Sequence, residues 1–204
     1  MMRLPFSLPR LALAMLAAAP IALLGGCISL AAKPPASLLV LNTAAPVPVD
    51  RASNSAAAAT LTILLPSVPQ ALATQRVPVQ TSANSIAYLK GALWAEPPSR
   101  LFARLLSDTV QARTGRLVLT PAQALSDPGA RLSGELRNFT VDEAAKEAVV
   151  TYDATLVRGA GKPFEKRRFE ARARLAVINP QSAAASLGKA ANQVAAQVAT
   201  WVGQ

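Results

Sequence analysis

The alternation of apolar and charged residues from Arg168 to Ile178 constrains the fold of this chain more than any other feature. Successive side chains of a strand point to opposite faces, so this period of two predicts a half-buried antiparallel strand. Residues 148–157 alternate in the same way, and residues 132–139 are expected to form another strand before them. Because the connections are short, the three segments predict an antiparallel meander. The inward side chains of the last strand would be Phe169, Ala171, Ala173, Leu175 and Val177.

Two further segments have the spacing of amphipathic helices. Pro97 suits the first position of a helix that Gly115 is placed to end. Asn179 and Pro180 form the cap and first residue of a second helix. The apolar faces would be Leu101, Phe102, Leu105, Leu106 and Val110 in the first helix, and Leu187, Ala191, Val194, Val198 and Trp201 in the second.

Shorter apolar segments between turn-forming residues predict additional strands at 37–42, 60–65, 76–80, 86–90 and 116–119. The sum is an α+β fold, with a mainly antiparallel sheet and two amphipathic helices packed on one face. The sequence has no internal repeat, and we expect residues 37–204 to form a single domain.

The first 26 residues have the character of a removable export signal. Arg3 and Arg10 give the chain a basic N-terminal region, as export signals have. The apolar run that follows, from Leu11 to Leu24, has 14 residues, whereas a helix that spans a membrane needs about 20. Leu24-Gly25-Gly26-Cys27 resembles the bacterial lipobox, in which cysteine follows two small residues. We therefore expect Cys27 to be lipidated and residues 27–36 to form a tether. The alternative is a chance cysteine near an ordinary cleavage site.

Acylation of Cys27 would anchor the protein firmly, because each buried CH₂ contributes about 0.8 kcal/mol and several chains act together. Ile28 follows the cysteine, where an acidic residue tends to retain lipoproteins at the inner membrane of enteric-type bacteria. The sequence thus favours the periplasmic face of the outer membrane over the inner membrane.

The composition excludes several kinds of chemistry. The chain has one cysteine and no histidine, which rules out internal disulfides, Cys/His zinc sites and Ser-His-Asp or Cys-His catalysis. The acidic residues form no pair typical of acid–base catalysis, and Gly159-Ala160-Gly161-Lys162 lacks the spacing of a phosphate loop. We expect a protein that is not an enzyme, with no cofactor other than the covalent lipid on Cys27.

The charge predicts an anionic partner or surface. The formal charge of the whole chain is +10, and loss of the two leader arginines leaves 19 basic residues against 11 acidic ones. Export makes nucleic acid an improbable partner and leaves a membrane or an acidic protein. Arg168, Arg172 and Arg174, which follow Lys166-Arg167, form a candidate patch; the alternative is the solvated face of an outer strand.

The region around the first helix resembles a known family. Ile86-Ala87-Tyr88-Leu89, then Leu93-Trp94-Ala95-Glu96-Pro97 and then the helix look like the ABC-type transport auxiliary lipoprotein family. The chain departs from that pattern at Leu39 and Leu41, where an aromatic residue is common, and at Pro98. The resemblance implies an accessory of a system with an ABC ATPase, a permease and a periplasmic MCE-type subunit, which moves phospholipid or other hydrophobic molecules between the membranes.

On that interpretation, the chain is a non-catalytic subunit that docks the MCE-type subunit at the outer membrane. The candidate partner-binding residues are Tyr88, Trp94, Glu96, Arg168, Arg172 and Arg174. For Tyr88 and Trp94 the alternative is packing of the first helix on the sheet. The alternative function is a structural or assembly lipoprotein of the outer membrane, a helper in lipopolysaccharide or barrel assembly. Transported substrate, direction and oligomeric state stay open.

Overall fold

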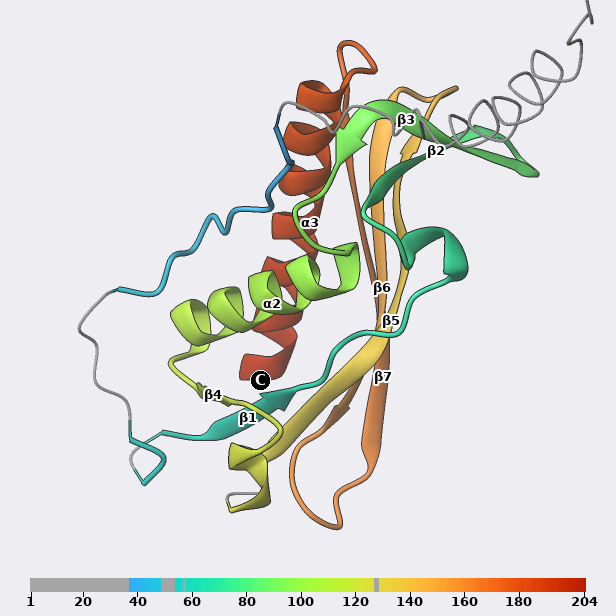
Figure 1. Ribbon diagram of the computed structural model, residues 1–204. Coiled ribbons are helices and arrows are strands. Elements are labelled where there is room, and N and C mark those ends of the chain that lie inside the picture. Colours follow the sequence, from blue (N-terminus) through green and yellow to red (C-terminus); the bar gives the residue numbers. More distant parts are fainter. Residues whose placement is uncertain (1–36, 49–53, 57, 127–128) are drawn as a thin grey trace, which may run out of the picture. The chain divides into compact units, whose positions relative to one another are not determined.

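The computed structural model describes residues 37–204, apart from 49–53, 57 and 127–128 (Figure 1). The signal, Cys27 and the tether therefore lie outside the described residues. The strands are β1 (Thr60–Ile63), β2 (Arg76–Ser82), β3 (Ser85–Leu93), β4 (Leu117–Leu119), β5 (Ala130–Asp142), β6 (Glu147–Val157) and β7 (Phe164–Arg174). The α-helices are α2 (Pro98–Thr114) and α3 (Pro180–Gly203), and two short 3₁₀ helices, η2 (Gln70–Leu72) and η3 (Gln123–Leu125), occur in loops.

The described strands form one mixed sheet. The predicted meander is present, since β5, β6 and β7 pair antiparallel in sequence order, and β2 and β3 form an antiparallel hairpin. However, β1 and β2 both pair parallel to β5, and β4 pairs parallel to β1. The chain from β1 to β2 follows one edge of β5, with a single bridge from Ser67 to Glu135 between the two strands. The α+β prediction is confirmed, whereas the antiparallel description holds only in part.

Both α-helices lie on the same face of the sheet (Figure 1). The predicted apolar stripes of α2 and α3 are buried throughout. Gly115 ends α2 in the left-handed conformation with φ of 70°, and the Asn179 side chain accepts a 2.8 Å hydrogen bond from the Ser182 N–H. The predicted start of α2 is wrong by one residue, because Pro97 is extended and Pro98 takes the first helical position.

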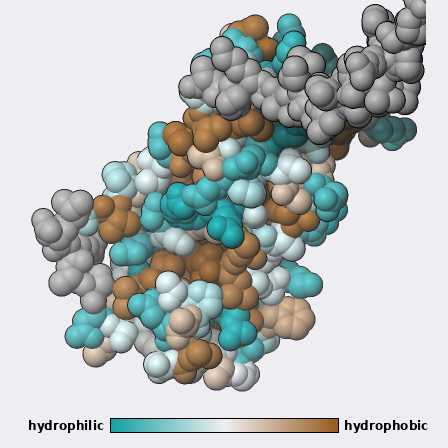
Figure 2. Space-filling model, in the orientation of Figure 1, coloured by the Kyte–Doolittle hydropathy of each residue, from teal (hydrophilic) through white to brown (hydrophobic). Residues whose placement is uncertain are grey.

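Aromatic pairs join the helices to the sheet and complete the core. Phe102 of α2 meets Tyr152 of β6 with ring centroids 5.3 Å apart, and Trp201 of α3 meets Phe169 of β7 at 5.5 Å. On the side viewed in Figure 2, hydrophobic side chains (brown) also reach the surface at the upper end, near the first described residues and α3.

Two predicted strands differ from the structure. The segment 37–42 is extended but forms only one bridge, from Leu39 to Trp94. The last strand runs from Phe164 to Arg174 rather than from Arg168 to Ile178. Val177 is therefore 55 % exposed instead of inward-facing, because the chain leaves the sheet to reach the cap of α3. Alternation in the sequence thus continued past the point where pairing with β6 stops.

Candidate functional site

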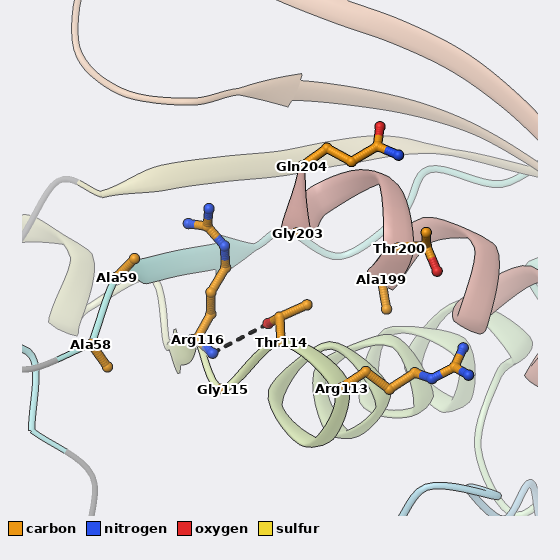
Figure 3. A pocket seen from close by; sticks show the side chains of 10 residues that line it. All are labelled: Ala58, Ala59, Arg113, Thr114, Gly115, Arg116, Ala199, Thr200, Gly203 and Gln204. Carbon is orange, nitrogen blue, oxygen red and sulfur yellow. Dashed lines mark hydrogen bonds between the residues drawn. The ribbon is translucent and has the colours of Figure 1, made fainter.

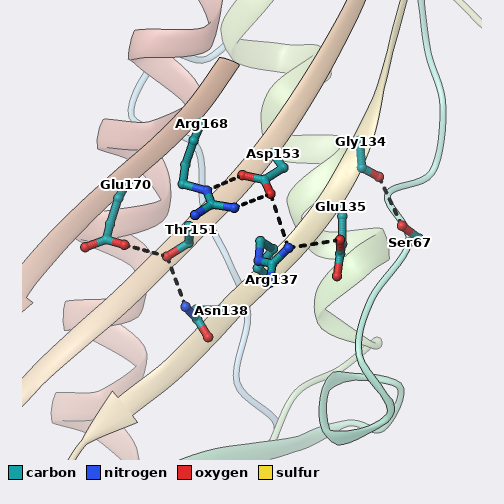
Figure 4. Close-up of polar contacts among 9 residues, drawn as sticks. All are labelled: Ser67, Gly134, Glu135, Arg137, Asn138, Thr151, Asp153, Arg168 and Glu170. Carbon is teal, nitrogen blue, oxygen red and sulfur yellow. Dashed lines mark hydrogen bonds and ion pairs between the residues drawn. The ribbon is translucent and has the colours of Figure 1, made fainter. Parts of the chain in front are cut away.

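The face of β5, β6 and β7 that points away from the helices carries three of the predicted partner-binding residues. We call it the open face, and Figure 4 shows its polar network. The opposite side of the same strands is the covered face. The polar residues of the open face include Glu135, Arg137, Asn138, Glu147, Thr151, Asp153, Arg168, Glu170, Arg172 and Arg174.

A β-bulge in β5 arranges the middle of the open face. The pairing between β5 and β6 shifts between Leu136 and Asn138, so Arg137 is the extra residue. As a result two consecutive polar residues reach side chains of β6: Arg137 bonds to Asp153, and the Asn138 amide donates to Thr151 at 3.2 Å. The bulge also restores the inward direction of Phe139, which is fully buried.

Asp153 is the centre of this network. Arg168 grips it through two hydrogen bonds, Nε to Oδ1 at 2.6 Å and Nη2 to Oδ2 at 2.7 Å, and Arg137 Nη1 lies 3.4 Å from Oδ2. These bonds, with that from Arg168 first, hold the pKa of the Asp153 carboxyl below its ordinary value. The positive charge of Arg168, which was predicted to face a partner, is thus largely balanced by the Asp153 carboxylate of the neighbouring strand β6.

Arg172 and Arg174 occupy the same face nearer the end of β7. Arg172 Nε donates to Glu170 at 2.9 Å, and both arginines approach Glu147 of β6 at 3.8 Å. The Arg174 side chain is nevertheless 92 % exposed, so its charge remains available to a partner. The open face is therefore a ladder of alternating charges rather than the purely basic patch that the sequence of β7 predicts.

The open face also contains a cleft of about 530 Å³. Its lining residues come from three strands: Gly134, Glu135, Asp153, Ala154, Thr155, Lys166, Arg167 and Arg168. Asp153, Glu147 and Thr151 were not among the predicted site residues. The alternation of residues 147–157 could have shown that these three side chains point away from the core. Only the pairing of β6 with β5 and β7 shows which charged side chains lie beside them.

Tyr88 and Trp94 lie in different surroundings, one partly exposed and the other in the core. Trp94 is fully buried, with its ring 5.5 Å from Phe139, as the packing alternative expects. Tyr88 is 36 % exposed, and the Arg76 guanidinium lies 4.9 Å from its ring centroid. A register shift in β3 lies between them, and Gly91 there has φ of 72°, a conformation that side chains disfavour. The shift takes the outer part of the β2–β3 hairpin off the core.

Glu96 lies just before α2 and pairs with Arg104 at 2.7 Å. This contact joins the residues before α2 to its second turn, and both side chains are partly exposed. Glu96 is therefore neither with Tyr88 on the hairpin nor with the arginines of the open face. The six predicted partner-binding residues do not form one site.

A second pocket, of about 760 Å³, was not anticipated from the sequence (Figure 3). It lies between the last turns of α2 and α3 and the start of β1. Arg113 and Arg116 line it, and the Thr114 hydroxyl accepts a 3.2 Å bond from the Arg116 N–H. Figure 3 shows the two guanidinium groups pointing in different directions, so they do not converge on one ligand position.

Within the described part of the chain, no three His, Cys, Asp or Glu side chains are grouped closely enough to hold a metal ion. Neither described α-helix has the length and apolar composition needed to cross a membrane.

A family model and two solved structures match this chain. A family model described as the ABC-type transport auxiliary lipoprotein component matches residues 40–199. A crystal structure of a Xanthomonas campestris protein of the family DUF330 superposes with a TM-score of 0.68 at 17 % identity, covering 81 % of this chain and 94 % of that one. A second crystal structure, of a protein described as uncharacterized, gives a TM-score of 0.62 at 19 % identity, covering 71 % and 92 %. No curated protein matches the sequence.

Proposed function

Because this chain belongs to the family of ABC-type transport auxiliary lipoprotein components, we propose that it is the accessory lipoprotein of an MCE-type ABC transport system. Such a system would move phospholipid or another hydrophobic solute across the envelope. The family match over residues 40–199 is the observation that supports this proposal most strongly. The subunit itself would be non-catalytic and would connect the periplasmic MCE-type subunit to the outer membrane.

The anchor in this proposal is the acylated Cys27, which is the only cysteine of the chain and follows a lipobox-like sequence. Mass spectrometry of the mature N-terminus tests it. We expect cleavage before Cys27 and a mass increase from diacylglyceryl and acyl groups, both lost in Cys27→Ser. An unmodified cysteine in the wild-type protein would contradict the anchor.

We assign docking of the MCE-type subunit to the open face. Arg168 and Arg172 there are already paired with carboxylates, so a partner's acidic groups meet partly ordered guanidinium groups at a reduced cost in side-chain entropy. No described helix covers this face. A polar, arginine-rich surface of this kind suits a protein interface that forms and separates, more than a permanent apolar one.

Co-purification of the lipidated protein with the MCE-type subunit tests the docking. We expect recovery of both proteins, and about tenfold weaker association for Arg172→Ala/Arg174→Ala, because interface charges are lost. Arg113→Ala/Arg116→Ala is the matched control, since it removes the same charge from the pocket of Figure 3. Equal weakening in both variants would show a general charge effect rather than a docking face.

Recovery of the wild-type protein alone in several mild detergents would contradict the transport role. Recovery with a β-barrel protein of the outer membrane would instead support the assembly-lipoprotein function.

A further inference from the structure

From the distribution of exposed apolar residues, we infer that the end of the domain formed by the first described segment and the β2–β3 hairpin rests on the lipid surface. We call this the upper surface, because β2 and β3 lie at the upper end of Figure 1, and define it by the exposed residues Leu38, Val40, Ile86 and Tyr88. The inference rests on the proposed function, because it takes the membrane to be the one that holds Cys27.

The first described segment is hydrogen-bonded to the end of the β2–β3 hairpin. The Leu39 N–H donates to the Leu93 carbonyl at 2.7 Å, and the Ala95 N–H donates to the Leu39 carbonyl at 2.8 Å. The segment therefore extends the β3 end of the sheet. Leu38 and Val40, on either side of Leu39, are 53 % and 56 % exposed, and Ile86 on the hairpin is 51 % exposed. Exposed apolar groups in this arrangement mark an interaction surface.

The few charges of these two segments favour a lipid surface over a charged protein as the occupant of the upper surface. Residues 37–48 contain no charged side chain, and the hairpin from Arg76 to Leu93 contains only the two basic residues Arg76 and Lys90. The two segments themselves contribute no carboxylate, although Asp142 and Glu143, at the end of β5, lie beside Gln80 of the hairpin. Tyr88, with Arg76 against its ring, has the amphipathic character of residues that lie at the headgroup level.

The position of the anchor supports the same occupant. The upper surface begins at Ser37, and an extended chain from Cys27 to Ser37 spans at most about 35 Å. The acyl chains thus bring these residues to a high local concentration near the bilayer, where even weak insertion of a few apolar side chains is sufficient.

Site-specific fluorescence in vesicles tests the inference, because acylation of Cys27 leaves the chain without a free thiol. Single variants Leu38→Cys and Ile86→Cys are labelled with the polarity-sensitive dye NBD and reconstituted, acylated, into phosphatidylethanolamine–phosphatidylglycerol vesicles. Leu125→Cys and Phe164→Cys are matched controls, being exposed apolar positions outside both segments. We expect blue-shifted emission and about a twofold rise in intensity at positions 38 and 86, but not at the controls.

Equal responses at all four positions, whether all shifted or none, would overturn the inference. Labelling of the wild-type protein distinguishes this failure from that of the proposed function, since a reactive Cys27 means that no acyl anchor is present. In that event the same four labelled variants are made in the Cys27→Ser background and mixed with vesicles, and the vesicle-bound protein is isolated by flotation. A stronger NBD response at positions 38 and 86 than at the controls would still support the inference, and an equal response would overturn it. Melting temperatures of the labelled variants show that each is folded.

Discussion

Alternate residues of β5, β6 and β7 form the covered face and the open face, and the two faces are stabilised by different interactions. In the core that the covered face shares with the helices, burial of apolar area is the main source of stability. Three buried polar atoms of this core have no hydrogen-bond partner in the described part of the chain: Trp94 Nε1, Thr109 Oγ1 and Tyr152 Oη. On the open face, the charged groups form ion pairs, most of them between neighbouring strands. The covered face therefore supplies stability, and the open face supplies oriented groups that a partner can exchange.

The largest test of this comparison is Trp94→Ala. Trp94 is fully buried against Phe139, so its loss should lower the free energy of unfolding by about 3–5 kcal/mol. Tyr88→Ala, on the exposed part of the hairpin, should cost less than about 1 kcal/mol. Urea unfolding measures both. A small effect at Trp94 would show that the covered face is not where the stability resides.

The second test adds an atom to the covered face instead of removing one. A Cβ at Gly134 would lie 2.8 Å from two ring carbons of Tyr152 and would also collide with the Asp153 carbonyl. Gly134→Ala should therefore cost about 1–3 kcal/mol. Gly188→Ala is the control, because its new methyl meets only Leu41 at 3.8 Å and replaces glycine within a helix. It should raise stability by about 0.5–1 kcal/mol.

The same comparison explains how far sequence analysis could go. Alternation, cap residues and apolar stripes are local, and they predicted the meander, both α-helices and the inward residues of β6. The bulge at Arg137 and the shift at Gly91 depend on which strand lies alongside, so neither follows from one segment alone. For this reason the arginines of β7 were recognised, but the pairing of Arg168 with Asp153 and the different surroundings of Tyr88 and Trp94 were not.

A third test removes one of the unpartnered atoms. Burial raises the pKa of the Tyr152 phenol well above its ordinary value, and its hydroxyl has no partner among the described residues. Tyr152→Phe keeps the ring contact with Phe102 and should stabilise the protein by about 1 kcal/mol, because a buried hydroxyl is no longer desolvated. Tyr88→Phe, at the surface, should change stability by less than about 0.5 kcal/mol. Destabilisation by Tyr152→Phe would indicate that a water molecule satisfies the hydroxyl.

The smallest effect concerns the open face, where Asp153 is paired with Arg168 but remains partly exposed to solvent. Asp153→Asn should cost only about 0.2–1 kcal/mol at pH 7, because solvent screens the pair. The pKa of Asp153 is depressed in the folded state, so its stabilising contribution is present above the ordinary Asp pKa and is lost as the pH falls through the folded value.

The difference in unfolding free energy between wild type and Asp153→Asn should therefore be constant from pH 7 to about pH 5 and shrink below the ordinary Asp pKa of about 3.9. Asp142→Asn, at the far end of β5, is the control variant. A difference that stays constant into strong acid would mean that Asp153 acts through its shape and neutral hydrogen bonds. A difference of several kcal/mol at pH 7 would mean that the open face contributes to folding as the covered face does, and the division between stability and recognition would not hold.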